Sequence, residues 1–539
     1  MTDLEIASLA KSLNIGDIFK KISDSSYDLI PYGDNKAKLR LNYGSKHGKL
    51  ILVTAINPTP YGEGKTTVSI GLDDALCRLG KNSIAVLRQP SMGPVFGMKG
   101  GATGGGYSQI IPMDEVNLHF TGDFHAISSA NNLLSAAIDN HIYQGNELDI
   151  RRVVFNRCLD VNDRALRNIR LADREEKFNI TAASEIMALF CLANSLSDLK
   201  RRLGNIVIGY NSKNEEVYAR DLKIEGALTV ILKDAFLPNL VQTLENNPVI
   251  VHGGPFANIA HGCNSLVATK LGLSLADYVV TEAGFGADLG AEKFFDIKCR
   301  NGNLSPDVVV LVATIKALKY NAFVSKDDIL KENVEAVKIG LSNLEAHVNN
   351  LKKFGVNIVV CLNKYNTDTS SEIDVVSKYC SNNNIEFAVS SAYVDGGKGA
   401  LSLAEKVIDA CNLENNFNYL YDSELPIKEK IEILCREIYH AKDISYSDTA
   451  MNKINSLEND AHSHLPICVS KTQYSLSDDA KKLGNPGDYT IFVRDIELYN
   501  GAEFITVILG SILRMPGLPK NPNYEKIDLD DKEQVVGLF

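Results

Sequence analysis

One stretch of the sequence combines glycines, a lysine and threonines at a spacing that suits phosphate binding. The run Thr59-Pro60-Tyr61-Gly62-Glu63-Gly64-Lys65-Thr66-Thr67 follows the apolar segment Leu50–Ile56 and leads into a helical pattern that begins at Lys65. In that setting backbone N–H groups and the positive end of the helix dipole point at an anion. The lysine reaches the β- and γ-phosphates, and the Thr66 hydroxyl can bind Mg²⁺. A strict nucleotide loop has glycine at the position of Thr59, but the flanking strand and helix argue against a chance turn. The sequence therefore predicts a nucleotide-binding loop with Lys65 exposed at the helix start.

A later segment indicates which nucleotide base the protein would bind. Proteins that read guanine carry Asn-Lys-x-Asp after a strand. Here Asn363-Lys364-Tyr365-Asn366 follows the predicted strand Val356–Leu362, with Asn where the guanine-pairing Asp would stand. We therefore expect ATP rather than GTP.

Arg88 and a glycine-rich run follow the next predicted strand, Ser83–Arg88. Several glycines between Gly97 and Gly106 surround Lys99. Glycines let backbone approach a ligand closely, and ligands of parallel α/β sheets bind beyond the carboxyl ends of the strands. Arg88 would then face the same crevice as the phosphate loop, where a guanidinium can grip an oxyanion through two hydrogen bonds. The alternatives are a flexible linker for the glycines and a surface ion pair for Arg88.

Two further glycine clusters follow predicted strands. His252-Gly253-Gly254-Pro255-Phe256-Ala257-Asn258 comes after Val249–His252 and would open a helix, which is favourable for an anion. Gly284–Gly290 comes after Asp277–Glu282 and lies one residue off the dinucleotide pattern G-x-G-x-x-G. NAD binding is therefore a weaker alternative.

Short apolar runs alternate with longer amphipathic ones along most of the chain. The predicted strands are Leu50–Ile56, Ser83–Arg88, Asn205–Gly209, Val249–His252, Asp277–Glu282, Asp307–Ala313, Val356–Leu362 and Ile385–Val389. The predicted helices are Lys65–Leu79, Ile180–Leu203, Phe256–Leu271, Val334–Phe354 and Ser371–Ser381. This alternation is typical of a parallel sheet covered by helices on both faces. We predict an α/β fold with a P-loop NTPase-like parallel sheet flanked by helices in residues 1–303, a second α/β domain in 304–415 and a smaller C-terminal domain in 416–539.

Composition narrows the class of protein. The chain has 539 residues, of which 45% are hydrophobic and 23% charged, and its net charge of −11 argues against a nucleic-acid partner. The most apolar run, Val308–Ala313, is far too short for a membrane helix. The ten cysteines include no Cys-x-x-Cys pair, and no signal-peptide pattern is present. These features predict a cytoplasmic protein with reduced thiols and no membrane partner.

Long stretches of the sequence resemble the formate–tetrahydrofolate ligase family, also called 10-formyltetrahydrofolate synthetases. They are Thr54–Thr67, Arg88–Ile127, Arg151–Ile169, Ile180–Ala193, Val251–Ser265, Thr281–Arg300, Asn363–Asp368 and Arg514–Asn521. The resemblance implies an ATP-dependent carbon–nitrogen ligation in two steps. Formate attacks the γ-phosphate of MgATP to give formyl phosphate, and N10 of tetrahydrofolate then attacks the formyl carbon. The products are 10-formyltetrahydrofolate, ADP and phosphate.

The resemblance also implies roles for particular residues. Lys65 and its loop hold the ATP phosphates, Thr66 holds Mg²⁺, and Arg88 grips formyl phosphate. Asp123 falls where the family places a carboxylate that contacts the pterin, and Phe285 is a candidate for the adenine side. The second domain would contribute to the folate site. Family members are homotetramers stimulated by a monovalent cation such as K⁺ or NH₄⁺, and we expect no tightly bound organic cofactor.

The folate side departs from the family pattern. Gln89 stands where the family has Glu, and Tyr365 and Tyr393 stand where it has the folate-stacking Phe and Trp. Tyrosines keep the π-faces and add hydroxyls. A Lys/Glu pair of the family is reversed here as Asp395 and Lys398. The expected substrates are formate, ATP and tetrahydrofolate, with or without a polyglutamate tail. The alternatives are a diverged relative that binds or hydrolyses ATP with weakened or lost folate ligation, and a nucleotide-switch or scaffold ATPase.

Overall fold

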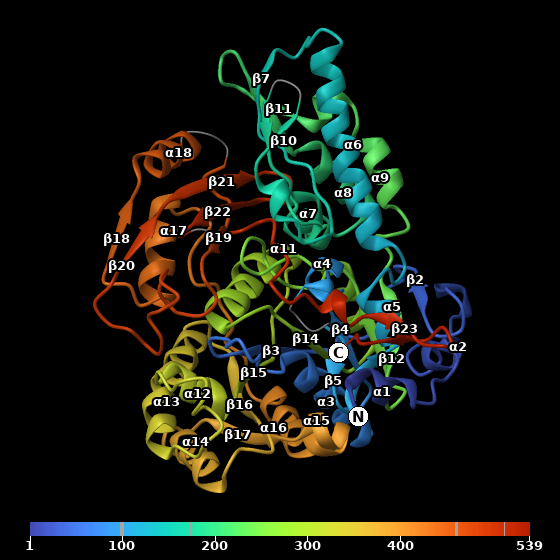
Figure 1. Cartoon of the computed structure of the whole chain (residues 1–539), viewed down its shortest axis with the longest axis vertical. Helices are drawn as coiled ribbons and strands as arrows, with labels where there is room; N and C mark the ends of the chain where they lie inside the picture. Colours follow the sequence, from blue (N-terminus) through green and yellow to red (C-terminus); the bar gives the residue numbers. More distant parts are fainter. Residues whose placement is uncertain (98–101, 172–173, 459–461, 511, 539) are drawn as a thin grey trace.

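The computed structural model describes residues 1–97, 102–171, 174–458, 462–510 and 512–538. It is a mixed α/β structure built on one large sheet that is rich in parallel strands and flanked by helices, as the alternation predicts (Figure 1). Lys99, Gly100 and Gly101 of the glycine-rich run lie outside the described residues. None of the described helices is both long and apolar enough to cross a membrane.

The large sheet has 12 strands, with a parallel region at its centre. The parallel strands, in spatial order, are β13 (Pro248–Val251), β4 (Ser83–Leu87), β14 (Tyr278–Glu282), β3 (Lys49–Ala55), β15 (Val308–Ala313), β16 (Asn357–Asn363) and β17 (Glu386–Ser390). Antiparallel strands extend it beyond β13: β12 (Asn239–Thr243), β2 (Ala37–Leu39), β1 (Leu29–Pro31), β6 (Ser108–Ile111) and β5 (Gly104–Gly105). Each predicted strand forms within two residues of its expected bounds, although Asn205–Gly209 belongs to another sheet.

Helices surround this sheet and connect its strands. They are α1 (Asp3–Ser8), α2 (Ile15–Phe19), α3 (Lys65–Arg78), α4 (Met92–Phe96), α5 (Met113–Asn117), α10 (Leu266–Leu275), α11 (Arg300–Gly302), α12 (Ile315–Asn321), α13 (Val334–Lys352), α14 (Ser370–Asn382), α15 (Ala392–Asp395) and α16 (Leu401–Cys411). Strands β15 to β17 lie in the expected second domain yet continue the sheet that begins in the first.

Alternate residues of β3 bury against opposite helical layers. Leu50 and Leu52 join the core that includes α10 and α13, whereas Ile51 and Val53 join the core that includes α3 and α16. Because successive side chains of a strand point to opposite faces, a strand covered on both sides is a continuous apolar run. This explains why the central strands were visible in the sequence.

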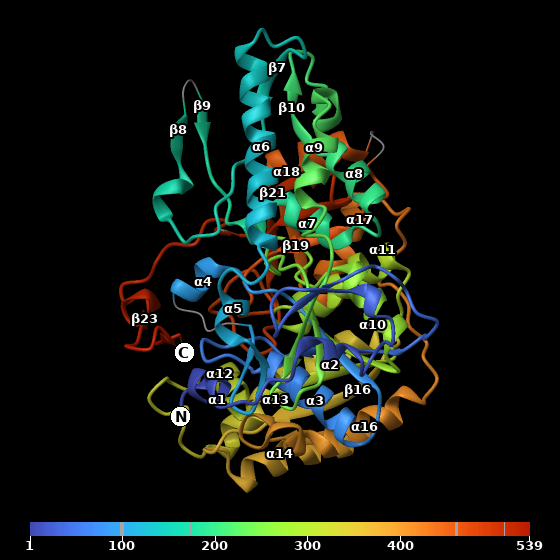
Figure 2. The same cartoon turned by 90° about the vertical axis from the view of Figure 1, so that its right-hand side faces the viewer.

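A second region stands above the sheet in Figure 1 and contains the longest helix, α6 (Asp123–Tyr143). Its other elements are α7 (Glu185–Leu192), α8 (Leu196–Gly204), α9 (Glu225–Leu232) and the sheet of β7 (Ile150–Val153), β10 (Val207–Asn211) and β11 (Glu216–Tyr218). The hairpin of β8 (Ile169–Leu171) and β9 (Arg174–Glu176) projects from this region (Figure 2).

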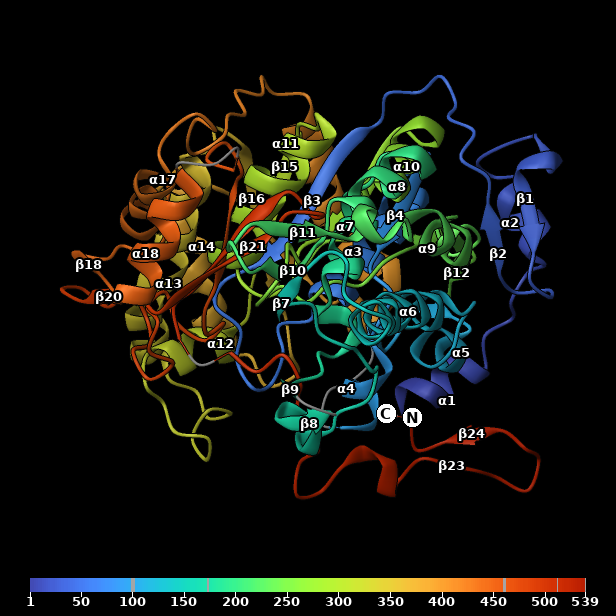
Figure 3. The ribbon, with the colours of Figure 1, turned by 90° about the horizontal axis from the view of Figure 1, so that it is seen from above.

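The C-terminal part packs beside these two regions. It contains α17 (Ile427–Ile433), α18 (Asp448–Glu458), the pair β18 (Asp443–Tyr446) and β20 (Thr490–Val493), and the sheet of β19 (Ile467–Ser470), β22 (Phe504–Ile508) and β21 (Asp495–Tyr499). A last hairpin, β23 (Asp528–Leu529) and β24 (Val535–Val536), lies apart from the main body in Figure 3.

Two helix predictions were wrong in their extents. The predicted helix Ile180–Leu203 is divided into α7 and α8, because the Ser195 side chain accepts a hydrogen bond from the backbone N–H of Asp198 and starts a new helix. The predicted helix Phe256–Leu271 begins only at Leu266, where Ser265 caps the first turn in the same way. The cluster His252–Asn258 therefore leads into a loop and not into a helix N-terminus.

Candidate active site

The predicted phosphate loop leaves β3 and enters α3 through glycines with left-handed backbone. Gly62 has a φ of 77° and Gly64 a φ of 70°, and α3 begins at Lys65. These conformations favour glycine because a Cβ atom is strained there. Pro60 and Tyr61 form the exposed tip of the loop. The first turn of α3 thus lies at the carboxyl edge of the parallel sheet, with its free N–H groups available there.

Glu63 ties this loop to neighbouring strands. One carboxylate oxygen accepts the backbone N–H of Thr59 at 2.8 Å, and the other accepts the hydroxyl of Thr314, which follows β15, at 2.8 Å. The side-chain amide of Asn363, the last residue of β16, donates to the Glu63 carbonyl at 3.0 Å. Burial raises the pKa of Glu63. The shape of the loop is therefore set by contacts within the protein.

Replacing Gly64 by alanine should weaken MgATP binding about 10-fold or more. A left-handed backbone costs a non-glycine residue roughly 1–2 kcal/mol. A Cβ atom at this position would also collide with the side-chain amide of Asn363. Gly62→Ala is the matched control, because Gly62 has a similar φ but open space around its Cβ position. Calorimetric titration that shows equal losses for both variants would contradict the importance of the Asn363 contact.

Lys65 is half-buried, which corrects the expectation of an exposed lysine. The start of α3 packs among strand ends, and burial lowers the pKa of the Lys65 ammonium group. The carboxylates of Glu282 and Glu63 act in the opposite direction, and Arg88 adds repulsion. No hydrogen bond or ion pair joins this ammonium group to another side chain in the described ranges. Lys65 thus supplies a desolvated positive charge beside the loop.

Glu282, the last residue of β14, links Thr66 with Arg88. The Thr66 hydroxyl donates to one Glu282 oxygen at 2.8 Å, and Arg88 Nε lies 3.8 Å from the other. Glu282 is 2% exposed, and its Oε1 has no hydrogen-bond partner in the described part of the chain. A buried carboxylate oxygen without a hydrogen bond is costly. A threonine hydroxyl beside a carboxylate is also the oxygen donor set that Mg²⁺ prefers. These residues therefore fit the metal that accompanies ATP.

The two later glycine clusters meet around Arg88, directly after β4. Arg88 Nη1 donates to the carbonyl of Pro255 at 3.5 Å, in the first cluster. In the second cluster, a Cβ atom at Gly284 would lie 2.6 Å from the Cβ of Ala257 and 3.0 Å from Arg88 Nη1, so glycine at this position avoids a collision with Ala257 and lies close to Arg88. The Arg88 side chain is 20% exposed. The expectation that Arg88 and the phosphate loop share one crevice agrees with the contact that each makes with Glu282.

Phe285 follows the same strand end as Glu282. It is half-buried and has a φ of 63°, an uncommon conformation for a bulky residue. The chain continues in π-helical turns over Ala287–Ala291 and Phe294–Cys299. A dinucleotide site would need a regular helix N-terminus here, so this geometry disfavours the NAD alternative.

Gln89, which directly follows Arg88, and Asp123 are both buried. The Gln89 side-chain oxygen is buried and has no hydrogen-bond partner in the described residues. Asp123, at the start of α6, forms a buried ion pair with Lys38 at 2.6 Å and accepts the side-chain amide of Asn239 at 2.7 Å. Burial lowers the pKa of Lys38. The Asp123 carboxylate is thus engaged within the protein, whereas the Gln89 acceptor is not.

Tyr365 lies beside the phosphate loop, whereas Tyr393 lies beside Gly106. The Tyr365 hydroxyl is 3.5 Å from the Gly62 carbonyl, and the Lys316 ammonium group lies 3.8 Å from the centre of its ring. Burial raises the pKa of Tyr365 to about 12, with smaller contributions from the carboxylates of Glu63 and Asp368. Tyr393 is 48% exposed. The Tyr393 backbone packs closely on Gly106. A Cβ atom at position 106 would collide with the Tyr393 carbonyl group, which explains why glycine occupies this position.

Glu282 and Lys316 are the site residues that sequence reasoning missed. Glu282 had a usable signal, because it is an acidic residue that ends an apolar strand in the same sheet as the phosphate loop. Lys316 had none, since its place over the Tyr365 ring depends on how α12 packs.

The site therefore gathers a phosphate-loop lysine and threonine, a carboxylate and an arginine at the ends of the adjacent strands β3, β14 and β4. The sequence model of the formate–tetrahydrofolate ligase family matches residues 1–539. The match covers the whole chain, and the enzymes of this family are ligases that form 10-formyltetrahydrofolate. The chain belongs to the formate–tetrahydrofolate ligase family.

Proposed function

We propose that this protein ligates formate to tetrahydrofolate through formyl phosphate at the expense of MgATP. The observation that carries the proposal is that Glu282 contacts both Thr66 and Arg88, next to Lys65 at the start of α3, in a chain that matches the ligase family throughout. A lysine and a threonine suit the nucleotide phosphates, and a separate arginine suits a second anion.

In the first step a formate oxygen attacks the γ-phosphorus, and the bond to the β-phosphate oxygen breaks as ADP leaves. Lys65 and the N–H groups at the start of α3 hold the phosphates in line. In the second step N10 of tetrahydrofolate attacks the formyl carbon, loses its proton, and displaces phosphate. Arg88 stabilises the negative charge that grows on the carbonyl oxygen. The loop from Thr59 to Gly64 positions the nucleotide.

The Mg²⁺ bound to ATP neutralises phosphate charge. Thr66 would hold it through its hydroxyl, and Glu282 would face it through the carboxylate oxygen that lacks a hydrogen bond. Because Glu282 also lies beside Arg88, one carboxylate would position both the nucleotide and the formyl phosphate ends of the site.

Replacing Glu282 by glutamine should abolish most of the gain in ATP affinity that Mg²⁺ provides. The amide keeps the shape and a hydrogen bond with Thr66 but loses the charge. We expect at least a 10-fold weaker affinity for MgATP, with the affinity for ATP in chelator changed only a few-fold. Calorimetry with and without Mg²⁺ measures both values. An unchanged Mg²⁺ dependence would show that Glu282 does not face the metal.

On the folate side, Gln89, Asp123, Tyr365 and Tyr393 remain the proposed contacts, and Phe285 remains the proposed adenine contact. Gln89 is supported by its buried, unpartnered oxygen, which suits an N–H donor of a pterin ring. Tyr365 is supported by its ring position beside the phosphate loop. Asp123 would have to bind the pterin while it is paired with Lys38.

Replacing Gln89 by glutamate, the family residue, should lower the KM for tetrahydrofolate about 5- to 30-fold. A hydrogen bond to a charged acceptor contributes about 1.5–3 kcal/mol, against about 0.5–1.5 kcal/mol for a neutral one. The KM for ATP should stay unchanged. Unchanged tetrahydrofolate KM and transfer rate in Gln89→Glu would remove Gln89 from the folate site.

Several further features are proposed from the family. We expect a homotetramer, stimulation by a monovalent cation such as K⁺ or NH₄⁺, a cytoplasmic location, and the three-domain division at residues 303 and 415. The substitutions at Gln89, Tyr365 and Tyr393 favour one second candidate, a relative that hydrolyses ATP with weakened folate ligation.

The decisive experiment measures ADP release by the purified protein with formate and tetrahydrofolate added separately and together. The ligase proposal expects ADP release and 10-formyltetrahydrofolate only when both are present. Steady ADP release that is independent of both would support the diverged ATPase. A nucleotide-dependent change in self-association without formate dependence would support a switch or scaffold.

A further inference from the structure

The first helix of the chain, α1, contacts a residue of the proposed folate side. The hydroxyl of Tyr393, in α15, donates a hydrogen bond to Asp3 Oδ1 at 3.0 Å. In Figure 1 α1 lies next to β5 and α15. The two residues are 390 positions apart in the sequence, so only the tertiary fold brings them together.

The same carboxylate also holds the tight turn between β5 and β6. Asp3 Oδ1 accepts the backbone N–H of Gly106 at 2.9 Å, and the Asp3 carbonyl accepts the side-chain amide of Gln109 at 2.9 Å. A Cβ atom at Gly105 would lie 3.0 Å from Asp3 Oδ2 and 3.1 Å from Tyr393 Cε2. Glycine at position 105 therefore lets a carboxylate and an aromatic ring approach the turn together.

The backbone of Tyr393 is fixed, whereas its ring is half-exposed. The Tyr393 carbonyl accepts the N–H of Tyr107 at 2.8 Å, and the Ala392 carbonyl accepts the Ser108 hydroxyl at 2.9 Å. The ring can still turn about its two side-chain torsion angles. The hydrogen bond with Asp3 acts at the far end of the ring and therefore restricts both rotations.

The Tyr393 hydroxyl keeps its proton at neutral pH. Burial, followed by the negative charge of Asp3, raises the pKa of Tyr393 above its usual value. The phenol is therefore the donor and the carboxylate the acceptor, and a bond to a charged acceptor is stronger than one between neutral groups. The tryptophan that the family resemblance leads us to expect at this position has no hydroxyl. The departure at Tyr393 thus comes with a partner for the group that it adds.

We propose that Asp3 is a positioning residue of the folate site, whose carboxylate fixes the Tyr393 ring against the β5–β6 turn for stacking on the substrate. This inference rests on the proposed folate contact of Tyr393. A ring that is ordered before binding loses less conformational entropy when the folate stacks on it. Asp3 therefore lowers the KM for tetrahydrofolate and leaves unchanged the chemical steps that are assigned to Lys65 and Arg88.

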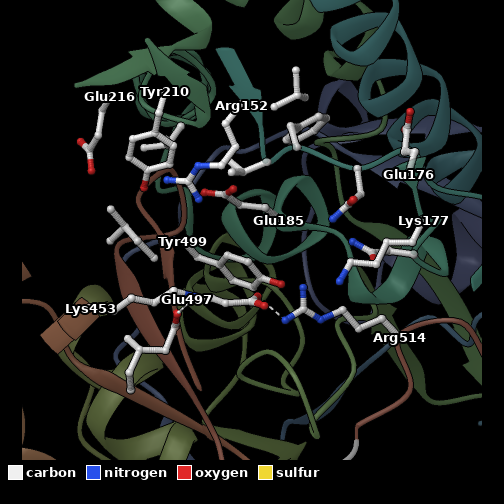
Figure 4. Close-up of a pocket in the computed structure, with 18 of the residues that line it drawn as sticks. Arg152, Glu176, Lys177, Glu185, Tyr210, Glu216, Lys453, Glu497, Tyr499 and Arg514 are labelled. Carbon is white, nitrogen blue, oxygen red and sulfur yellow. Dashed lines mark hydrogen bonds and ion pairs between the residues drawn. The ribbon is translucent and has the colours of Figure 1, made fainter. Parts of the chain in front are cut away.

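The contact lies outside the polar cavity shown in Figure 4. That cavity has a volume of about 1400 Å³ and is lined by residues of β7, β10, α18 and β21, among others. Asp3 and Tyr393 do not belong to its lining. Substitutions at these two positions therefore report on the ring contact and leave the lining of the cavity as it is.

The test measures the steady-state kinetics of formyl transfer in Asp3→Ala, Tyr393→Phe and the double variant of the full chain. Each single change should raise the KM for tetrahydrofolate about 3- to 10-fold, with kcat and the KM for ATP unchanged. The double variant should have the same KM as Asp3→Ala, because both changes remove the same hydrogen bond.

Two further variants separate this contact from a general effect on α1. Asp3→Asn keeps an acceptor oxygen and should recover most of the affinity for tetrahydrofolate. Glu5→Gln is the matched control for charge, since it removes a carboxylate from the same helical turn. Glu5 accepts the backbone N–H of Thr2 at 2.7 Å, a bond that glutamine can also accept.

The wild-type protein is measured first, so that the inference and the proposed function can fail separately. If wild-type ADP release requires formate and tetrahydrofolate, an unchanged tetrahydrofolate KM in Tyr393→Phe would overturn the inference alone. Equal losses in Glu5→Gln and Asp3→Ala, or additive losses in the double variant, would overturn it as well. Wild-type protein without tetrahydrofolate-dependent activity would overturn the proposed function and this inference with it.

Discussion

Replacing Lys65 by alanine should reduce formate- and tetrahydrofolate-dependent ADP release by at least ~10³-fold while the protein stays folded. Removal of one electrostatic donor from a transition state costs about 10²–10³-fold, and Lys65 is proposed to hold phosphates in both the ground state and the transition state. Its ammonium group is desolvated and has no ion-pair partner in the described part of the chain, so its charge is not already neutralised by a neighbouring carboxylate. Steady-state kinetics measures the loss of ADP release, and calorimetry measures the loss of MgATP affinity.

Fold integrity is not expected to depend on this lysine, because truncation removes a half-buried charge and leaves the Glu63 contacts intact. Thermal unfolding should therefore shift little. Lys81→Ala is a suitable control, since Lys81 is exposed just beyond α3 and lies outside the site. Wild-type MgATP affinity in Lys65→Ala would remove this residue from the nucleotide site.

Replacing Arg88 by serine should leave MgATP affinity within a few-fold and depress formyl transfer by at least ~10²-fold. Arg88 is 3.8 Å from Glu282 and 3.5 Å from the Pro255 carbonyl, so its present contacts are long and leave donors for an anion. Loss of a donor that acts on the developing oxyanion lowers kcat more than it raises KM. Initial rates of 10-formyltetrahydrofolate formation at saturating ATP measure this effect.

Arg88→Lys separates charge from geometry. A lysine keeps a positive charge near Glu282 but lacks the planar fork, so transfer should still be strongly reduced. If the Arg88→Lys variant keeps the wild-type rate of formyl transfer, the role of Arg88 is to balance the charge of Glu282. If ATP affinity and turnover fall by the same factor in Arg88→Ser, the residue belongs to the nucleotide site alone.

The local framework of the site could be predicted from the amino-acid sequence. β3 and α3 were recognisable because a buried strand is a continuous apolar run and because glycines must mark the left-handed turn before Lys65. The family was also recognisable from long matching stretches, and the full-length match confirms it. These signals depend only on neighbours along the chain, so they do not require knowledge of the strand order.

The side chains that complete the loop from distant parts of the chain could be identified only from the folded structure. Glu282 meets Thr66 across 216 residues, Thr314 meets Glu63 across 251, and Asn363 meets the Glu63 carbonyl across 300. These contacts exist because β14 and β15 are the neighbours of β3 in the sheet and β16 is the next strand after β15. Hydrophobic periodicity does not encode this strand order. Burial of Lys65 follows from the same packing, since desolvation depends on what surrounds a charge in space and not on its neighbours in sequence.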